Sequence, residues 1–209
     1  FNGIDNYIQM FQSPEFWKAT WNTILFCILT VPVGIILALL VALLLNAKVK
    51  FKGGFRAIYF LPMVCAPAAI AMVWRWMFNG EYGIINQILG TKISWLTDPK
   101  TAIVACAIVA IWSSIGYDAL PMISPTLFVT LIMRMMASLK VYDLIYMMID
   151  QSNPVLPDVQ SLMYLFYREA FVAGNKGYAS AIVIWTIFLI GIVTIVQFIG
   201  QKKWVNYDV

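Results

Sequence analysis

The sequence predicts an all-α protein built as a polytopic transmembrane helix bundle. Hydrophobic residues make up 62% of the 209 residues, charged residues only 11%, and the mean hydropathy is +0.82. Soluble domains contain about 25% charged residues, so this composition excludes an ordinary soluble protein. Long apolar runs recur along the chain, and each approaches the ~20 residues that a helix needs to cross the hydrocarbon core of a bilayer.

Five crossings are predicted from these apolar runs. The region between Ala102 and Ile149 is apolar over about twice the ~20 residues of one crossing, so we divide it into two. Phe1–Ala19 is too polar to cross and is predicted to be a lead-in, with a helix starting at Ser13-Pro14-Glu15. The five predicted spans are Trp21–Leu45, Ala57–Phe78, Ala102–Leu120, Met122–Ile149 and Ala179–Gly200.

Prolines and glycines mark expected irregularities in these spans. A proline removes a backbone hydrogen bond that other groups must replace, so kinks are expected at five positions. Gly34 and Gly191 are candidates for close helix packing. After the fourth span we expect an ordered loop and then a short amphipathic helix over Val159–Val172. The five prolines are Pro32, Pro62, Pro67, Pro121 and Pro125.

The basic residues predict the orientation of the chain. The loop Asn46–Arg56 has four positive charges and no negative charge, which is typical of a cytoplasmic loop. Lys202 and Lys203 should lie on the same side, which requires an even number of crossings between Leu120 and Gly200. A cytoplasmic turn at Leu120/Pro121 satisfies this requirement and places Phe1–Ala19 outside. We therefore expect a first transmembrane helix before residue 1, and at least six crossings.

The most pointed polar pattern lies in the fourth span, where Thr130, Arg134, Ser138 and Tyr142 are spaced by four and share one helix face. An arginine at membrane depth costs about 2.5–3.5 kcal/mol on insertion scales and usually faces protein or water. Two interpretations remain open. Arg134 forms an internal ion pair with Asp118 or Asp143, or the face lines a hydrated solute path.

Catalytic, metal and cofactor sites are not predicted. The chain has no His, its three cysteines (Cys27, Cys65 and Cys106) lie in apolar segments, and no Gly-rich phosphate-binding loop occurs. The net charge of +4 is explained by basic cytoplasmic loops and does not indicate nucleic acid.

Taken in order, the motifs resemble the permease subunit of binding-protein-dependent ABC importers of the maltose type. The resemblance covers nearly the whole chain. It is carried by Gly3-Ile4-Asp5-Asn6-Tyr7, Phe16-Trp17-Lys18-Ala19-Thr20-Trp21-Asn22-Thr23, Phe55-Arg56 with Phe60-Leu61-Pro62, Val73-Trp74-Arg75-Trp76-Met77-Phe78, Tyr82-Gly83 with Asn86, Trp95-Leu96-Thr97-Asp98-Pro99, Leu120-Pro121 with Pro125, and Tyr167-Arg168-Glu169-Ala170-Phe171 with Gly177-Tyr178-Ala179.

The resemblance implies one permease domain over residues 1–209 with the type I importer fold, in a bacterial cytoplasmic membrane. It implies a non-catalytic subunit that imports a carbohydrate by alternating access. The implied partners are a second homologous permease, two cytoplasmic ATPase subunits that bind ATP and Mg, and an extracytoplasmic solute-binding protein. The helix with Arg134 lines the solute path in relatives, and a buried guanidinium leads us to expect an acidic oligosaccharide.

One departure from the family falls on the turn that the charges predict. Relatives have a cytoplasmic loop with a Glu-Ala-Ala motif that docks into the ATPase, and this sequence has none between Leu120 and Pro121. We therefore expect that a coupling loop is missing at this position. The alternative function is an ion-coupled secondary transporter using Asp118, Asp143 and Arg134, although no internal repeat supports it. A membrane-embedded enzyme would need a visible nucleophile, base or metal cluster.

Overall fold

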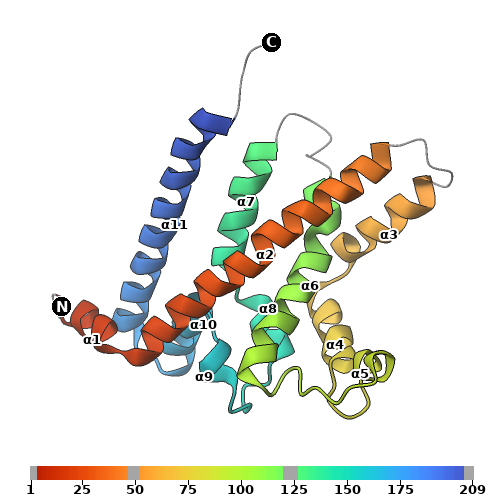
Figure 1. Ribbon diagram of the computed structural model, residues 1–209. Helices are drawn as coiled ribbons and strands as arrows, with labels where there is room; N and C mark the ends of the chain where they lie inside the picture. Colours follow the sequence, from red (N-terminus) through yellow and green to blue (C-terminus); the bar gives the residue numbers. More distant parts are fainter. Residues whose placement is uncertain (1–3, 47–51, 120–126, 205–209) are drawn as a thin grey trace.

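The computed structural model describes residues 4–46, 52–119 and 127–204. Its regular elements in these ranges are helices, as the sequence predicts (Figure 1). They are α1 (Asp5–Gln12), α2 (Pro14–Asn46), α3 (Lys52–Val64), α4 (Pro67–Met77), α5 (Ile84–Leu89), α6 (Pro99–Ala119), α7 (Leu127–Leu139), α8 (Asp143–Met148), α9 (Leu156–Val159), α10 (Leu162–Tyr167), the π-helix η2 (Arg168–Val172) and α11 (Lys176–Trp204).

Five passes through the molecule alternate in direction (Figure 1). We call the end of the molecule where α2 begins the Pro14 end, and the end where α2 finishes the Asn46 end. Helices α2, α6 and α11 run from the Pro14 end to the Asn46 end. The pairs α3/α4 and α7/α8 run back. The last turn of α6 and the first of α7 both lie at the Asn46 end, in agreement with the alternation predicted from the charges. The predicted turn at Leu120/Pro121 itself lies outside the described residues.

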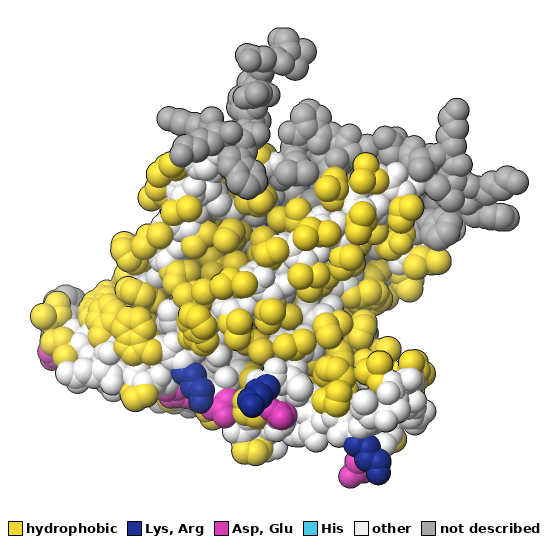
Figure 2. Space-filling model, in the orientation of Figure 1, with side chains coloured by type: hydrophobic (Ala, Val, Ile, Leu, Met, Phe, Trp, Pro, Cys, Tyr) yellow, Lys and Arg dark blue, Asp and Glu magenta, His cyan; other side chains and the backbone are white. Residues whose placement is uncertain are grey.

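Three of the predicted spans are continuous helices. The segments Pro14–Leu45, Pro99–Ala119 and Lys176–Gly200 are each long and apolar enough to cross a membrane. On the face shown in Figure 2, hydrophobic side chains cover the middle of the molecule, and the visible charged side chains lie along the Pro14 end. Helix α2 starts where the sequence predicts a helix start, and the hydroxyl of Ser13 accepts a hydrogen bond from the amide of Phe16 at 3.4 Å there.

The other two predicted spans, Ala57–Phe78 and Met122–Ile149, are wrong as continuous helices. The first is broken at residues 65–66 because Pro67 has no amide hydrogen and holds Ala66 in an extended conformation, with φ −61° and ψ 132°. The second is broken at residues 140–142 without a proline. There the hydroxyl of Ser161 donates to the carbonyl oxygen of Val141 at 2.5 Å, which satisfies a backbone group that the break leaves free.

The predicted amphipathic helix over Val159–Val172 is also divided. It comprises the end of α9, then α10, and then the π-helix η2. Ser161 caps α10, since its hydroxyl accepts a hydrogen bond from the amide of Tyr164 at 3.1 Å. This cap competes with continuation of α9 and explains why one helix does not form.

Glycine positions show which helices approach most closely. A Cβ atom at Gly34 would lie 2.7 Å from Nη2 of Arg134, so the prediction of close packing is confirmed there. At Gly191 nothing lies within 4 Å, so that prediction is wrong. Gly116 was not predicted, yet a Cβ atom there would lie 2.1 Å from the carbonyl oxygen of Tyr59. The contact of α6 with α3 therefore depends on Gly116.

We predict that Gly116→Val separates α3 from α6 and lowers the stability of the protein. Overpacking against backbone costs about 1–3 kcal/mol or more, because backbone cannot rotate away as a side chain can. Thermal unfolding of the purified protein in detergent measures the effect, with Gly191→Val as the matched control on open helix surface. Equal melting temperatures for the two variants would contradict the close contact.

Candidate functional site

A cavity of about 460 Å³ lies among α2, α6 and the two broken spans. Both breaks contribute to its wall, the first through Cys65 and Pro67 and the second through Lys140, Val141 and Tyr142. The hydroxyls of Thr30, Ser113 and Ser114 also line it, among mainly apolar neighbours. The helix breaks therefore border a partly open cavity with mixed polar and apolar walls, which is typical of a small-molecule site.

The predicted polar face reaches this cavity in part. Arg134 and Ser138 on α7, together with Tyr142 just after it, line the wall, and Asp143 joins them. Thr130 is buried on α7 nearer to the Asn46 end and is not among the lining residues. Three of the four residues of the predicted face therefore border the cavity, and Thr130 does not.

Arg134 forms an ion pair inside the bundle. Its Nη1 atom donates to Oδ2 of Asp118 at 2.8 Å, and the two side chains are only 7% and 4% exposed. A second donor, Nη2, lies 3.5 Å from the carbonyl oxygen of Thr30. Asp118 is therefore the partner of Arg134, and Asp143 is not. The pair links α6 to α7 across an apolar core and matches the buried charge with an opposite one.

Helix α2 provides the space and the hydrogen bonds for this pair. Gly34 leaves room for the guanidinium, since any Cβ atom there would collide with it. The hydroxyl of Thr30 donates to the carbonyl oxygen of Phe26 at 2.8 Å and lies 2.7 Å from the hydroxyl of Ser138, which must then donate to it. Thr30 was missed by the sequence analysis because only the packing of α2 on α7 gives it a role.

Four tyrosines pack against one another next to the cavity, whose wall includes Tyr142. Tyr142 and Tyr146 come from the α7/α8 region, and Tyr164 and Tyr167 come from α10. The ring centroids of Tyr142 and Tyr167 are 5.0 Å apart, and those of Tyr146 and Tyr167 are 5.4 Å apart. Such distances are within the usual range for aromatic pairs. The sequence analysis missed this tyrosine cluster because its two halves are remote along the chain.

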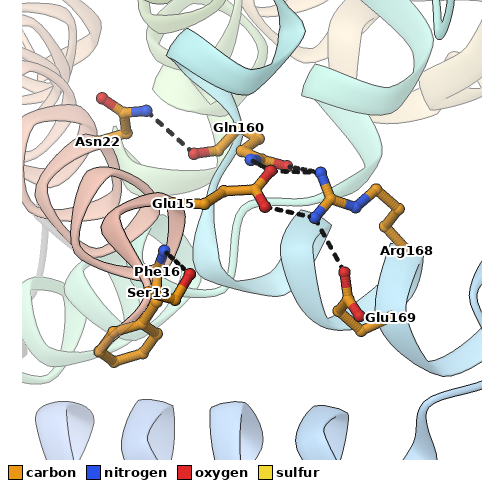
Figure 3. Close-up of polar contacts among 7 residues, drawn as sticks. All are labelled: Ser13, Glu15, Phe16, Asn22, Gln160, Arg168 and Glu169. Carbon is orange, nitrogen blue, oxygen red and sulfur yellow. Dashed lines mark hydrogen bonds and ion pairs between the residues drawn. The ribbon is translucent and has the colours of Figure 1, made fainter. Parts of the chain in front are cut away.

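An ionic cluster fixes η2 to the start of α2 (Figure 3). The guanidinium of Arg168 binds both carboxylate oxygens of Glu15, with 2.8 Å between Nη2 and Oε2, and also donates to Glu169 at 2.9 Å. The hydrogen bond to Glu15 is the largest of the effects that raise the pKa of Arg168 above its ordinary value. The side-chain amide nitrogen of Gln160 (Nε2) donates to Oε1 of Glu15 at 2.7 Å. This bidentate arrangement gives a defined geometry rather than a loose surface contact.

A second ion pair connects the ends of α4 and α8. Nη2 of Arg75 lies 2.9 Å from Oδ2 of Asp150. The hydrogen bond from Arg75, followed by those from Ser152, lowers the pKa of Asp150 to about 2. Asp150 is therefore ionised throughout the neutral range, and the pair persists there.

The described ranges contain few groups that are suited to metal binding or thiol chemistry. Within them, no group of three or more His, Cys, Asp or Glu side chains is placed to hold a metal ion. Cys27 and Cys106 are buried, whereas Cys65 is exposed at the first helix break. The expectation of no cofactor in this chain stays a prediction.

Comparison with known proteins connects this architecture to transport. No family model matches the chain. It is 38% identical over 123 residues to a probable ABC transporter permease protein of Pyrococcus horikoshii, covering 56% of this chain and 42% of the relative. It is 29% identical over 234 residues to the trehalose/maltose transport system permease protein MalF of Thermococcus litoralis, covering 94% and 78%. The sulfoquinovosyl glycerol transport system permease protein SmoG of Agrobacterium fabrum is 27% identical over 221 residues, covering 88% and 71%.

The chain is a homologue of sugar ABC transporter permeases. The predicted resemblance is thus confirmed, although the chain spans less than half the length of the Pyrococcus relative. A crystal structure of a bacterial ABC transporter involved in import of the acidic polysaccharide alginate matches 99% of this chain and 85% of that chain. Its TM-score is 0.85 at 19% identity. The permease fold predicted from the sequence is therefore confirmed.

We predict that the Arg134–Asp118 pair behaves as a unit in stability measurements. Arg134→Met or Asp118→Leu alone leaves one buried charge without a partner, at a cost of about 3–5 kcal/mol. The double variant removes both charges and should recover most of the loss. Thermal unfolding of all three variants in detergent gives the coupling between the two sites.

Asp143→Asn is the control, because it changes a carboxylate of the same region that does not bind Arg134. Additive losses in the double variant would show that the two residues do not depend on each other.

Proposed function

We propose that this chain is a permease subunit of an ATP-driven importer and that a carbohydrate crosses the membrane through its cavity. The observation that carries the proposal is the cavity of about 460 Å³ with mixed polar and apolar walls in the permease fold. Its volume lies within the range of about 300–1,000 Å³ that is usual for small-molecule sites. Relatives whose names specify trehalose and maltose, lactose, and sulfoquinovosyl glycerol support a carbohydrate solute.

The proposed solute contacts are the side chains of Ser138, Tyr142 and Lys140 at the cavity wall. Hydroxyls and an aromatic face suit a saccharide, which offers hydroxyl groups and apolar ring faces. The role that we propose for Arg134 is different. Because Asp118 matches its charge, its ability to bind a carboxylate of the solute is reduced, so the ion pair favours a structural function. An acidic solute therefore depends on Lys140 more than on Arg134.

The proposed assembly places the Pro14 end outside and the Asn46 end in the cytoplasm of a bacterial cell. Basic residues that favour this orientation occur at the start of α3 (Lys52 and Arg56) and at the end of α11 (Lys202 and Lys203), both at the Asn46 end. The partners are a second permease, two ATPase subunits that bind ATP and Mg, and a solute-binding protein that delivers the sugar from outside. A complex with a periplasmic protein carrying an alginate pentasaccharide has been crystallised for the alginate transporter of the same fold.

We infer that the ATPase contact lies in a loop between Leu120 and Pro121 that is absent from this sequence. The lengths of the matches support this inference. The match to the lactose permease protein LacF extends over 244 residues, more than the 209 residues of this chain, so the relative has additional residues inside the matched region. A gene sequence that runs directly from Leu120 to Pro121 would contradict this placement.

Uptake by the purified assembly in sealed vesicles tests the proposed function. We predict accumulation of a maltose-type oligosaccharide that requires ATP and the binding protein, and that persists when ion gradients are collapsed by ionophores. Tyr142→Ala should reduce uptake at least several-fold because it removes the proposed aromatic contact. In a parallel series, uptake of a uronate oligosaccharide is measured for the parent protein and for Lys140→Gln. This series decides whether the solute is acidic.

Tyr82→Ala, in the loop before α5, is the matched control, since it removes an exposed tyrosine that does not line the cavity. Uptake that follows an ion gradient without ATP would favour the secondary transporter instead.

A further inference from the structure

A second, smaller cavity lies at the Pro14 end of the molecule, where α4 and α8 finish (Figure 1). Its volume is about 190 Å³, and we call it the outer pocket. Three segments that are remote in the sequence form its wall: the end of α4, the loop before α6 and the loop after α8. Its polar and aromatic side chains include Arg75, Asn79, Ser94, Trp95, Thr97 and Asp150.

Asn86 of α5 fixes the shape of one side of the outer pocket. Its side chain is only 4% exposed. The Nδ2 atom donates to the carbonyl oxygens of Gly80 at 3.0 Å and Ile93 at 2.9 Å. Its Oδ1 atom accepts a hydrogen bond from Nε1 of Trp95 at 2.8 Å. The backbone on both sides of α5 and the indole of Trp95 are therefore held together by one buried amide.

Two further contacts attach the loop after α8 to this side. Nδ2 of Asn153 donates to the carbonyl oxygen of Leu96 at 2.9 Å. The Arg75–Asp150 ion pair joins the same loop to α4. The three segments of the wall are thus held in place by side chains of the protein itself. A site that is already formed loses less free energy in ordering its walls when a ligand binds.

Several polar groups on the wall are available to a ligand. In the described part of the chain, no hydrogen-bond partner is found for the hydroxyls of Ser94 and Thr97 or for Nδ2 of Asn79. Arg75 uses Nη2 for Asp150, which leaves its Nη1 atom as a further donor there. The half-buried ring of Trp95 adds an aromatic surface to the same wall.

This combination suits a neutral saccharide. Arg75 and Asp150 are the two charged residues of the lining, and their opposite charges favour neither an anion nor a cation. They place a donor and an acceptor side by side, and each sugar hydroxyl can both donate and accept. An aromatic ring can pack on the apolar face of a sugar ring. A volume below the ~300 Å³ of the smallest usual ligand pockets suits one sugar unit rather than an oligosaccharide.

The outer pocket and the main cavity lie along the same two helices. Helices α4 and α8 pack on each other. Ile70 of α4 and Met147 of α8 line the main cavity, whereas Arg75 of α4 and Met148 of α8 line the outer pocket. A sugar unit in the outer pocket would therefore lie on the Pro14 side of the main cavity.

We propose that the outer pocket is a second saccharide site, which binds one neutral sugar unit outside the main cavity. Arg75 and Asp150 bind its hydroxyls, Ser94 and Thr97 add hydroxyl contacts, and Trp95 packs on its ring. The inference rests on the proposed function, because it adds a site for the same class of solute at the Pro14 end.

Protection of a cysteine in the outer pocket tests this site. Thr97→Cys is introduced into the assembled importer together with Cys27→Ala, Cys65→Ala and Cys106→Ala, so that it is the only thiol of this chain. The side chain of Thr97 makes no hydrogen bond within the described residues, so the exchange removes no contact of the fold there. The rate of modification by a small, membrane-impermeant thiol reagent is measured with and without maltose. ATP and the binding protein are left out.

Maltose at high concentration is expected to slow modification at position 97 several-fold. Lys92→Cys in the same cysteine-free chain is the matched control, since it is exposed on the same loop and does not line the outer pocket. Its rate should not change with maltose. Equal rates at position 97 with and without maltose would overturn the site.

Two variants decide whether the protection arises in the outer pocket. Arg75→Gln should abolish protection at position 97, whereas Tyr142→Ala, in the wall of the main cavity, should leave it unchanged. The reverse result would assign the protection to the main cavity and overturn the outer site. An unchanged rate at position 92 in each variant shows that the external loop is still folded.

A uronate disaccharide tests the neutral class of the ligand. It should protect position 97 less than maltose does, and stronger protection by the uronate would contradict a neutral ligand. Because these measurements need neither ATP nor the binding protein, their failure is distinguishable from failure of the uptake measurement. Uptake of maltose without protection at position 97 would overturn the outer site alone.

Discussion

The arrangement of the bundle depends on the buried pair between Arg134 and Asp118. Two charges in an apolar core are tolerated only when they neutralise each other and their remaining donors find acceptors. The pair therefore fixes α7 against α6, and the carbonyl of Thr30 together with the gap at Gly34 fixes both against α2. These three helices form the frame on which the cavity is built.

The helix breaks give this frame an internal space. A continuous helix satisfies its own backbone, so it presents only side chains to its neighbours. A broken helix inside an apolar layer exposes amide and carbonyl groups that need partners, and such irregular backbone is tolerated where protein or a water-filled cavity meets it. In this protein both breaks border one cavity, and Ser161 supplies a partner for the carbonyl of Val141. The polar groups in the wall of the candidate solute path follow in part from this arrangement.

Much of this architecture could be predicted from the sequence, because membrane insertion imposes strong rules on length and charge. The apolar runs and the basic residues predicted five passes and their alternation. The position of Arg134 predicted a buried partner, although choosing Asp118 over Asp143 required knowing how α6 packs on α7. Pro67 indicated a kink, whereas the break at residues 140–142 has no proline and depends on contacts made by Ser161 from a remote segment.

The parts that were missed all depend on contacts between distant segments. Gly116 and Gly191 look alike in sequence, and only the neighbour that each one meets distinguishes them. Tyr164 and Tyr167 gain a role only when α10 is placed beside α8. The continuity of Leu120 with Pro121 lies outside the described residues, and the coupling loop proposed there stays a prediction.

If the cavity at the helix breaks is the path of the sugar, the solute should protect Cys65, which lies on the cavity wall, from chemical modification. In the assembled importer with Cys65 as the only thiol of this chain, binding protein loaded with the transported sugar, together with ATP, should slow or block labelling of Cys65 by a small maleimide. A sugar that the importer does not take up should give no protection. Labelling of Cys65 at the same rate with both sugars, in vesicles that actively import one of them, would contradict the assignment of this cavity as the solute path.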